Sequence, residues 1–281
     1  MATTAQPRTG TIEIGDGVYA FIQEAGATNA GFIVSDDGVL VIDALMTSAL
    51  AQRLIGEIKR VTDRPIRFVV YTHFHGDHTF GGVHFLPAAI VGHKECREEL
   101  FEKWDASVQR FATMRPEFAD EFRSLRITPP DIVFTEHLTL YLGGRRIDLI
   151  HLGRAHTRGD VFIYLPKERV LFSGDVVVNG RVPAAMDAYV SSWIRVLEQV
   201  QSLAVDVVVP GHGLLGDKST ISEQHAFLTE LKRQVQERFA AGKSAEETAA
   251  ELSFPQFASW PNIGNLTVPV QRLYLELRGQ L

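Results

Sequence analysis

Short apolar stretches separated by turn-forming residues dominate the first part of the chain. The tetrapeptide Ser35-Asp36-Asp37-Gly38 has the composition of a tight turn and separates two of these stretches. Because β-branched and aromatic residues fit the surface of a pleated strand, the pattern predicts strands over residues 11–14, 18–23, 31–34 and 39–43.

The hydrophobic period then changes to that of a helix. Between residues 48 and 61, apolar residues recur three or four positions apart, and Thr47 or Ser48 is available as the N-cap. A continuous apolar run over residues 66–71 follows, with the length of a strand buried on both faces. We expect helices to cover both sides of that strand.

The alternation of strands and helices continues to the end of the sequence. Residues 94–126 are rich in charged residues and phenylalanine and predict two helices broken at Pro116. Later strands are predicted at residues 132–134, 138–141, 145–151, 161–165, 170–173 and 205–209, and helices at 190–201, 220–240, 245–252 and 268–277. This order is typical of an α/β protein, in which functional loops lie where strands end.

Composition narrows the class of protein. The 281 residues allow one large domain or two small ones, and 45% hydrophobic with 22% charged residues is typical of globular proteins. The net charge of −6 gives no overall positive field, so we expect neither a nucleic-acid nor a membrane partner. Residues 1–10 are polar and lack an apolar leader, which favours a flexible tail and a cytoplasmic protein.

Cysteine usage limits the metal chemistry that is open to the chain. Cys96 is the only cysteine, so an intramolecular disulfide and a thiolate-rich metal site are both excluded. Any metal must therefore be held by histidine, aspartate or glutamate.

Four potential ligands follow the buried strand at 66–71 within six positions: His73, His75, Asp77 and His78. In an extended stretch, His73, His75 and Asp77 would point the same way, and Gly76 would permit a turn that brings His78 round. Imidazole and carboxylate ligands suit zinc, manganese or iron. Polar residues lying by chance beside a strand are the alternative, but this density favours a metal site.

One loop cannot saturate two metals, and three further candidates stand next to other predicted strands: His156, Asp175 and His212. Asp43 also ends a strand, where it would either orient a ligand imidazole or form a turn. The other five histidines lack a motif and are expected to be structural or on the surface: His84, His93, His137, His151 and His225.

The order and flanking residues of the motif His73-x-His75-x-Asp77-His78, then His156, Asp175 and His212, resemble the metallo-β-lactamase superfamily over most of residues 18–213. The resemblance implies a four-layer αβ/βα sandwich with the metals at one edge between two mixed sheets. We expect a single domain over residues 11–281, with a helical insertion at 94–126 and C-terminal helices at 220–281. In that family, residues matching His73, His75 and His156 bind one metal, those matching Asp77, His78 and His212 bind the second, and the residue matching Asp175 bridges both.

The best-known β-lactamases of this superfamily carry cysteine or serine at the position of Asp175, whereas a bridging aspartate is typical of its thioesterase, lactonase and phosphodiesterase branches. The resemblance therefore implies a hydrolase with two zinc ions, or alternatively iron or manganese. A metal-activated hydroxide would attack an ester, thioester, lactone or amide bond of a small molecule. Asp77 would orient that hydroxide and shuttle a proton. The sequence does not indicate an oligomeric state.

Three other activities stay open. His73, His156 and Asp175 also form a two-histidine, one-carboxylate set of the kind that holds a single iron, as in the persulfide dioxygenases of the same superfamily. A β-lactamase-like or phosphodiesterase activity is a further alternative. Around the metals, the helices at 94–126 and the loop at 179–189 would either form a lid and wall or simply pack, and Arg154 and Arg158 would either attract an anion or stay solvated.

Overall fold

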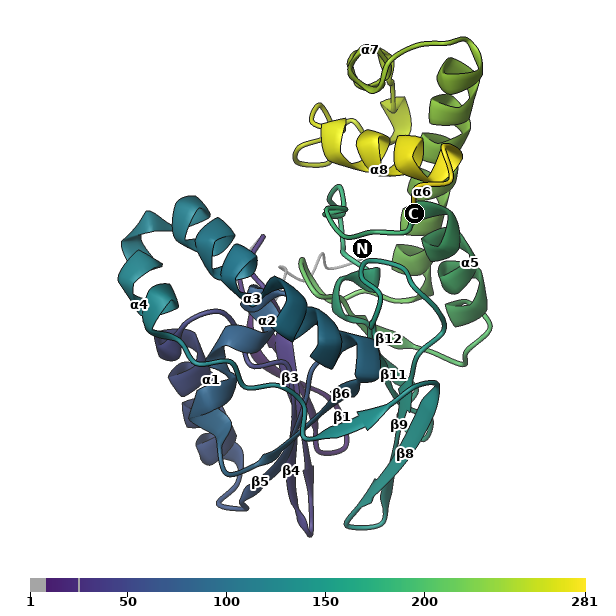
Figure 1. The fold of residues 1–281 in the computed structure, drawn as a ribbon. Coiled ribbons are helices and arrows are strands. Elements are labelled where there is room, and N and C mark those ends of the chain that lie inside the picture. The colour runs from purple at the N-terminus through teal and green to yellow at the C-terminus, as the bar shows by residue number, and fades with distance from the viewer. Residues whose placement is uncertain (1–8, 25) are drawn as a thin grey trace.

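A computed structural model of the chain describes residues 9–24 and 26–281, in which two mixed sheets lie between helices (Figure 1). The larger sheet has seven strands in the order β1-β2-β3-β4-β5-β6-β7, and the smaller has five in the order β12-β11-β10-β9-β8. The bounds are β1 (Gly10–Gly15), β2 (Val18–Ile22), β3 (Ala30–Ser35), β4 (Gly38–Ile42), β5 (Ile66–Val70), β6 (Ala89–His93), β7 (Ile132–Phe134), β8 (His137–Leu142), β9 (Arg145–Ile150), β10 (Phe162–Leu165), β11 (Val170–Phe172) and β12 (Val207–Val209).

Helices cover the outer faces of the two sheets. In Figure 1, α1, α3 and α4 lie on the side of the larger sheet, and α5 to α8 lie on the side of the smaller one. The α-helices are α1 (Ser48–Val61), α2 (Gly76–Thr79), α3 (Lys94–Met114), α4 (Ala119–Ser124), α5 (Val190–Val200), α6 (Lys218–Ala240), α7 (Ala245–Glu251) and α8 (Thr267–Leu277). Four 3₁₀ turns are η1 (Phe80–Phe85), η2 (Pro116–Phe118), η3 (Gly174–Val176) and η4 (Pro255–Phe257).

Three buried layers of side chains hold these elements together. One fills the space between the sheets and includes Leu40 and Val70 from the larger sheet and Leu149 from the smaller. A second lies between the larger sheet and α1, which buries Leu54 and Ile58 there. The predicted four-layer α/β sandwich is therefore confirmed.

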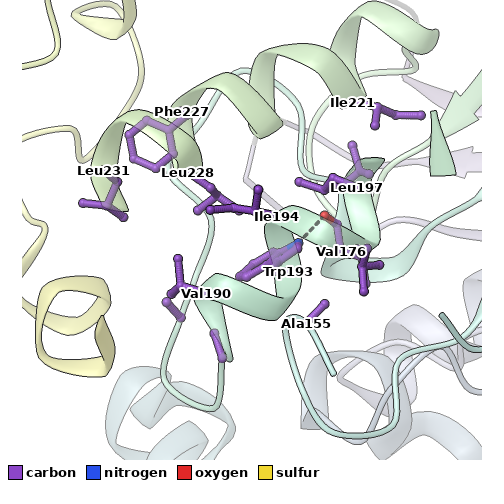
Figure 2. Close-up of a cluster of buried hydrophobic side chains, with 14 of the residues drawn as sticks. Ala155, Val176, Val190, Trp193, Ile194, Leu197, Ile221, Phe227, Leu228 and Leu231 are labelled. Carbon is purple, nitrogen blue, oxygen red and sulfur yellow. Dashed lines mark hydrogen bonds between the residues drawn. The ribbon is translucent and has the colours of Figure 1, made fainter. Parts of the chain in front are cut away.

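The third layer joins α5 and α6 to the smaller sheet (Figure 2). At its centre Trp193 is fully buried, and its Nε1 donates a hydrogen bond to the Val176 carbonyl at 2.9 Å. Phe227 and Leu231 of α6 belong to the same cluster. Because Val176 lies in η3, this core fixes the 3₁₀ turn that follows β11.

The strand predicted at residues 66–71 is β5, but its surroundings differ from the expectation. Val69 packs in the layer that contains α1, whereas Val70 packs between the two sheets. The prediction that helices cover both sides is wrong, since the second face is covered by the smaller sheet. A continuous apolar run signals burial of both faces without specifying which element buries each.

Most other predicted elements agree with the structure to within two residues at each end. The interruption at Pro116 is also present, as the turn η2 between α3 and α4. The parallel strand β6 and the short helix α2 were not predicted from the sequence pattern. Of the predicted tail, residues 1–8 lie outside the described residues and Gly10 already belongs to β1. The single-domain organisation and the insertion at 94–126 stay predictions.

Across residues 9–24 and 26–281, the structure contains no helix of sufficient length and apolar character to span a membrane.

The layer around α6 predicts a large effect of one core substitution. Leu231 is fully buried, so Leu231→Ala should lower the free energy of unfolding by about 2–5 kcal/mol through lost burial and the remaining cavity. Gln236 is exposed on the same helix, and Gln236→Ala should change it by no more than about 0.5 kcal/mol. Urea denaturation of both variants measures the difference; equal midpoints would contradict the assignment of this core.

Candidate metal centre

All seven residues predicted as ligands meet at one edge of the sandwich. His73 and His75 follow β5, and Asp77 and His78 lie on α2. The remaining three come from later connections, with His156 between β9 and β10, Asp175 on η3 after β11, and His212 after β12. The carboxyl ends of strands are where α/β proteins place their functional groups.

The ligand atoms form two groups. In the first, His73, His75, His156 and Asp175 each offer one atom, and these atoms lie within 4.8 Å of one another. His75 Nδ1 is 2.9 Å from His156 Nε2, which is 3.5 Å from Asp175 Oδ2. Zinc bonds of about 2.0–2.1 Å at tetrahedral angles place ligand atoms roughly 3.3–3.5 Å apart. The spacing between His156 and Asp175 matches this range, and the one between His75 and His156 is a few tenths of an ångström shorter, so a small divalent cation would need only a slight separation of these two rings.

The second group consists of Asp77, His78 and His212, whose ligand atoms also lie within 4.8 Å of one another. Asp77 Oδ2 is 3.3 Å from His212 Nε2 and 3.6 Å from His78 Nε2. All three side chains are again of the nitrogen and oxygen types that bind zinc, manganese or iron.

Asp175 lies between the two groups. Its Oδ1 is 3.2 Å from His78 Nε2, and its Oδ2 is 3.3 Å from His212 Nε2 as well as close to His156. This approach needs a glycine before His212, because a Cβ on Gly211 would lie 2.0 Å from Asp175 Oδ1. The carboxylate therefore reaches both groups at once.

The buried polar atoms at this site fit bound cations. Within the described part of the chain, His73 Nε2, His78 Nε2 and Asp175 Oδ1 are buried and have no hydrogen-bond partner. Burying polar atoms without partners is costly and rare in folded proteins. Divalent cations held by the two groups would give these atoms partners, with His73 in the first group, His78 in the second and Asp175 between them.

The ring nitrogens that point away from the centre are held by other groups. His78 Nδ1 donates to Asp43 Oδ2 at 2.7 Å, His75 Nε2 to Asp187 Oδ2 at 2.9 Å, and His156 Nδ1 to the Ala184 carbonyl at 3.0 Å. Such bonds fix the tautomer and the orientation of a ligand imidazole.

Asp43 accordingly holds the imidazole of His78, as expected for one of its two predicted roles. Its carboxylate also accepts hydrogen bonds from the Thr72 amide and hydroxyl, both at 2.8 Å. Its backbone φ of 60° lies in the left-handed region, which is uncommon for residues other than glycine. The loop after β4 is thus bent so that one carboxylate supports both Thr72 and His78.

The prediction that the Asp77 side chain points the same way as those of His73 and His75 is wrong. His75 is the N-cap of α2, so Asp77 and His78 lie on a helical turn and not on an extended strand. Gly76 is needed for a different reason from the one expected, since a Cβ there would lie 2.4 Å from the Phe80 ring. Helical geometry, not strand alternation, directs Asp77 and His78 to the second group.

Asp187 was missed by the sequence analysis. It lies in the loop at 179–189, and besides His75 its carboxylate binds Lys103 Nζ of α3 at 2.7 Å. Lys103 also donates to the fully buried Glu99 at 2.8 Å. A lone aspartate in a loop carries no local signal, so only the three-dimensional structure reveals this contact.

Charge and burial shift the pKa values of four of these histidines, lowering two and raising the other two. Burial lowers the pKa of His73 well below its usual value and that of His156 to about 3, so both imidazoles stay neutral and keep a lone pair. For His212, burial also lowers the pKa, but Asp175 and Asp77 outweigh it and raise the pKa to about 9. His78 likewise has a raised pKa, because Asp43, Asp77 and Asp175 outweigh its burial.

The five histidines without a motif stay outside both groups. His93 and His151 stack on each other with ring centroids 4.0 Å apart. Arg158, next to the His156 loop, pairs with the carboxylates of Glu95, Glu99 and Glu102. The Arg158 guanidinium is therefore partly buried and already paired with carboxylates of α3, which disfavours the binding of an anion there.

A cavity of about 550 Å³ opens next to the two groups and is lined by His75, Asp77, Asp175 and His212. Phe111 of α3 lines it and also packs in a small core, while Trp104 only packs, against Phe80. The loop at 179–189 contributes several lining residues. The helices at 94–126 and the loop at 179–189 thus form part of a wall, and some of their aromatic residues also pack in the core, so each of the two expected roles is met in part.

The comparisons with known proteins agree with this geometry. A family model described as the metallo-beta-lactamase superfamily matches residues 24–212. The chain belongs to the metallo-β-lactamase superfamily.

Individual relatives within the superfamily carry names that denote different activities. The chain is 25% identical over 217 residues to a linear primary-alkylsulfatase of Pseudomonas sp. (strain ATCC 19151), a match that covers 64% of this chain and 40% of that protein. It is 27% identical over 225 residues to the human acyl-coenzyme A thioesterase MBLAC2, covering 71% of this chain and 79% of that one.

A solved structure shares the fold over nearly the whole chain. The sec-alkylsulfatase Pisa1 from Pseudomonas sp. superimposes with a TM-score of 0.78 at 18% identity, covering 97% of this chain and 51% of that one. The chain thus spans about half or less of the alkylsulfatases that it matches.

The contact to His75 predicts that Asp187 supports metal binding. Asp187→Ala removes the acceptor of His75 Nε2 and should weaken the binding of zinc to the first group about 10–100-fold. Competition with a chromophoric chelator measures the affinity. Asp105 is exposed on α3, and Asp105→Ala is the matched control. Equal affinities of the two variants would show that His75 needs no partner.

The raised pKa values of His78 and His212 predict that metal binding depends on pH. At pH 7 both imidazoles carry a proton in the metal-free protein and must lose it to bind a cation, so zinc binding should release at least one proton and weaken as the pH falls. Calorimetric titration in buffers of different ionisation enthalpy counts these protons. A heat independent of the buffer would contradict the assignment.

Proposed function

We propose that this protein is a hydrolase that uses two divalent cations, zinc in the first instance. His73, His75 and His156 would hold one cation, and Asp77, His78 and His212 the other. Asp175 would give an oxygen to each. The observation that carries the proposal is the convergence of two complete ligand groups on this single carboxylate.

When bound, such cations lower the pKa of water from 15.7 toward ~7 and polarise the oxygen of the bond to be cleaved. The chain supplies the acid–base group. Asp77 faces the cavity, and its Oδ2 accepts a hydrogen bond from the Thr28 hydroxyl at 2.7 Å. Thr28 holds this carboxylate in place, and Asp77 would orient the attacking water and hold its proton.

An ester or thioester is the bond that we propose is cleaved. The names of the two relatives denote a sulfate ester and an acyl thioester as substrates. Both bonds join an electrophilic centre to a leaving oxygen or sulfur that becomes negative as the bond breaks. A cation beside that atom stabilises the developing charge. Lactone and amide bonds are less directly supported.

A single-iron oxidoreductase is the second candidate, because His73, His156 and Asp175 do lie together in the first group. Asp77 and His78 do not separate the two candidates, because the resemblance implies both residues in the single-iron branch too. The hydrolase is favoured because these two residues and His212 together form a second group of ligand type beside the first. Metal analysis of the purified protein separates the two, with two zinc ions per chain expected for the hydrolase and one iron for the oxidoreductase.

Substitution of one ligand and of the proposed acid–base group tests the function. His73→Ala should reduce the bound zinc to one ion or fewer per chain, and Asp77→Asn should lower turnover by about 10²–10⁴-fold. His225 belongs to neither group and pairs with Glu198, so His225→Ala is the control.

The substrates for this test are an acyl ester, an acyl thioester, an alkyl sulfate, a lactone, a phosphodiester and a β-lactam. Turnover of the first three is expected. The proposal fails if the fully zinc-loaded protein hydrolyses none of the six, or if both variants keep wild-type metal content and rates.

A further inference from the structure

The cavity beside the ligand groups has one polar end and two apolar walls. The ligand residues form the polar end. One wall comes from Met46 and Leu50, at the start of α1. A second apolar wall comes from Phe111 and Met114 at the end of α3 and Phe118 of η2. Met46 packs against the cluster that contains Phe111, so the two walls form one apolar lining beside the ligand residues.

Methionine is concentrated around this cavity. The sequence contains four methionines, of which Met1 lies outside the described residues. The other three all line the cavity: Met46, Met114 and Met186. Met114 is 63% exposed and Met186 39% exposed, which is unusual for large apolar side chains. Because methionine is unbranched and flexible, such walls adapt to apolar groups of variable shape.

The charges around the cavity are unbalanced. Arg110, Arg115 and Arg181 line it, whereas the carboxylates that line it are Asp77 and Asp175, which belong to the ligand groups. Arg115 pairs with Glu117. Among the described residues, no carboxylate lies within 4.0 Å of Arg110 or Arg181.

Arg110 and Arg181 differ in position. Arg110 Nε is buried without a hydrogen-bond partner in the described part of the chain, on the α3 wall. Arg181 Nη1 donates to the Gly26 carbonyl at 3.2 Å, and the same carbonyl accepts from His212 Nδ1 at 3.2 Å. Arg181 therefore lies beside a ligand histidine, at the polar end of the cavity.

We propose that the cavity binds an anionic amphiphile, with an apolar chain along the methionine-rich lining and a negative group held by Arg181. Arg110 adds positive potential along the α3 wall. This inference rests on the proposed hydrolase function and specifies its substrate class: an ester or thioester that carries both an apolar chain and an anionic group. Guanidinium groups suit carboxylate, sulfate and phosphate alike.

Direct binding to the zinc-loaded protein tests this substrate class independently of turnover. The probes are acetate, octanoate, decanoate and decyltrimethylammonium, each below its micelle-forming concentration and measured by calorimetry. Each added methylene that is buried should tighten binding about two- to fourfold. Decanoate should therefore bind at least tenfold more tightly than acetate, and the cation of the same length should bind at least tenfold more weakly than decanoate.

Two variants with matched controls assign the contacts. Arg181→Gln should weaken decanoate and acetate binding alike, by at least fivefold, whereas Met114→Ser should reduce the dependence on chain length. Arg195 is exposed on α5 and Phe101 is exposed on α3, and neither lines the cavity, so Arg195→Gln and Phe101→Ser should bind as the wild type does.

The outcomes separate this inference from the proposed function. Equal affinity for acetate and decanoate, or equal affinity for the anion and the cation of the same length, would overturn the amphiphile proposal. Hydrolysis of short neutral esters with no effect of chain length would keep the hydrolase and overturn the substrate class. Tight decanoate binding by a protein that hydrolyses nothing would keep the binding site and overturn the hydrolase.

Discussion

The structure depends on one constraint: each ligand imidazole must be held by its outer nitrogen so that its inner nitrogen faces the centre. The groups that hold them come from segments far apart in the sequence, such as Asp43 after β4 and Asp187 before α5. An imidazole without such a partner would rotate or change tautomer, and its lone pair would no longer point to the centre of its ligand group. The sandwich brings these loops together because several of its strands end at the same edge. The three buried layers therefore serve to keep the supporting groups within hydrogen-bond distance of the ligands.

The supports of the first ligand group extend into helices outside the two sheets. Glu99 of α3 is fully buried and accepts hydrogen bonds from Lys103, which holds Asp187, and from the Arg158 amide at 3.2 Å, two residues after His156. One carboxylate of α3 thus stands behind both His75 and His156. On the other side, Arg272 of α8 donates to the Ala188 carbonyl at 2.8 Å, next to Asp187. Helices α3 and α8 fix the loop at 179–189 from two directions, so their contribution to the metal centre is positional.

The sequence was informative where a physical signal is local. The period of apolar residues located α1 and most strands, and the density of histidine and aspartate after β5 located the centre. Strand β6 was missed because Ala89 to His93 is short, contains a glycine and has no alternating pattern. The position of Asp77 on a helical turn was missed because α2 has only four residues and no periodicity to detect. Asp187 reaches His75 and Lys103 only in the folded chain, and the cavity is lined by segments near α1, in α3 and in the loop at 179–189. No pattern along the chain encodes these contacts.

The two ligand groups differ in how they compensate charge, and this difference bears on how they bind cations. In the first group, burial lowers the pKa of His73 and of His156, and the neighbouring imidazoles add to this effect, so these two side chains present neutral nitrogens near neutral pH. In the second, the carboxylates of Asp43, Asp77 and Asp175 surround His78, and their combined negative charge favours protonated imidazole. A cation entering beside His73 would meet a lone pair that is already available, whereas one entering the second group would have to displace protons. Because Asp175 belongs to both surroundings, a cation in the first group would offset part of the negative charge that raises the pKa of His78 and His212. Filling the first group would therefore make deprotonation of the second easier, so the shared carboxylate would couple the two positions.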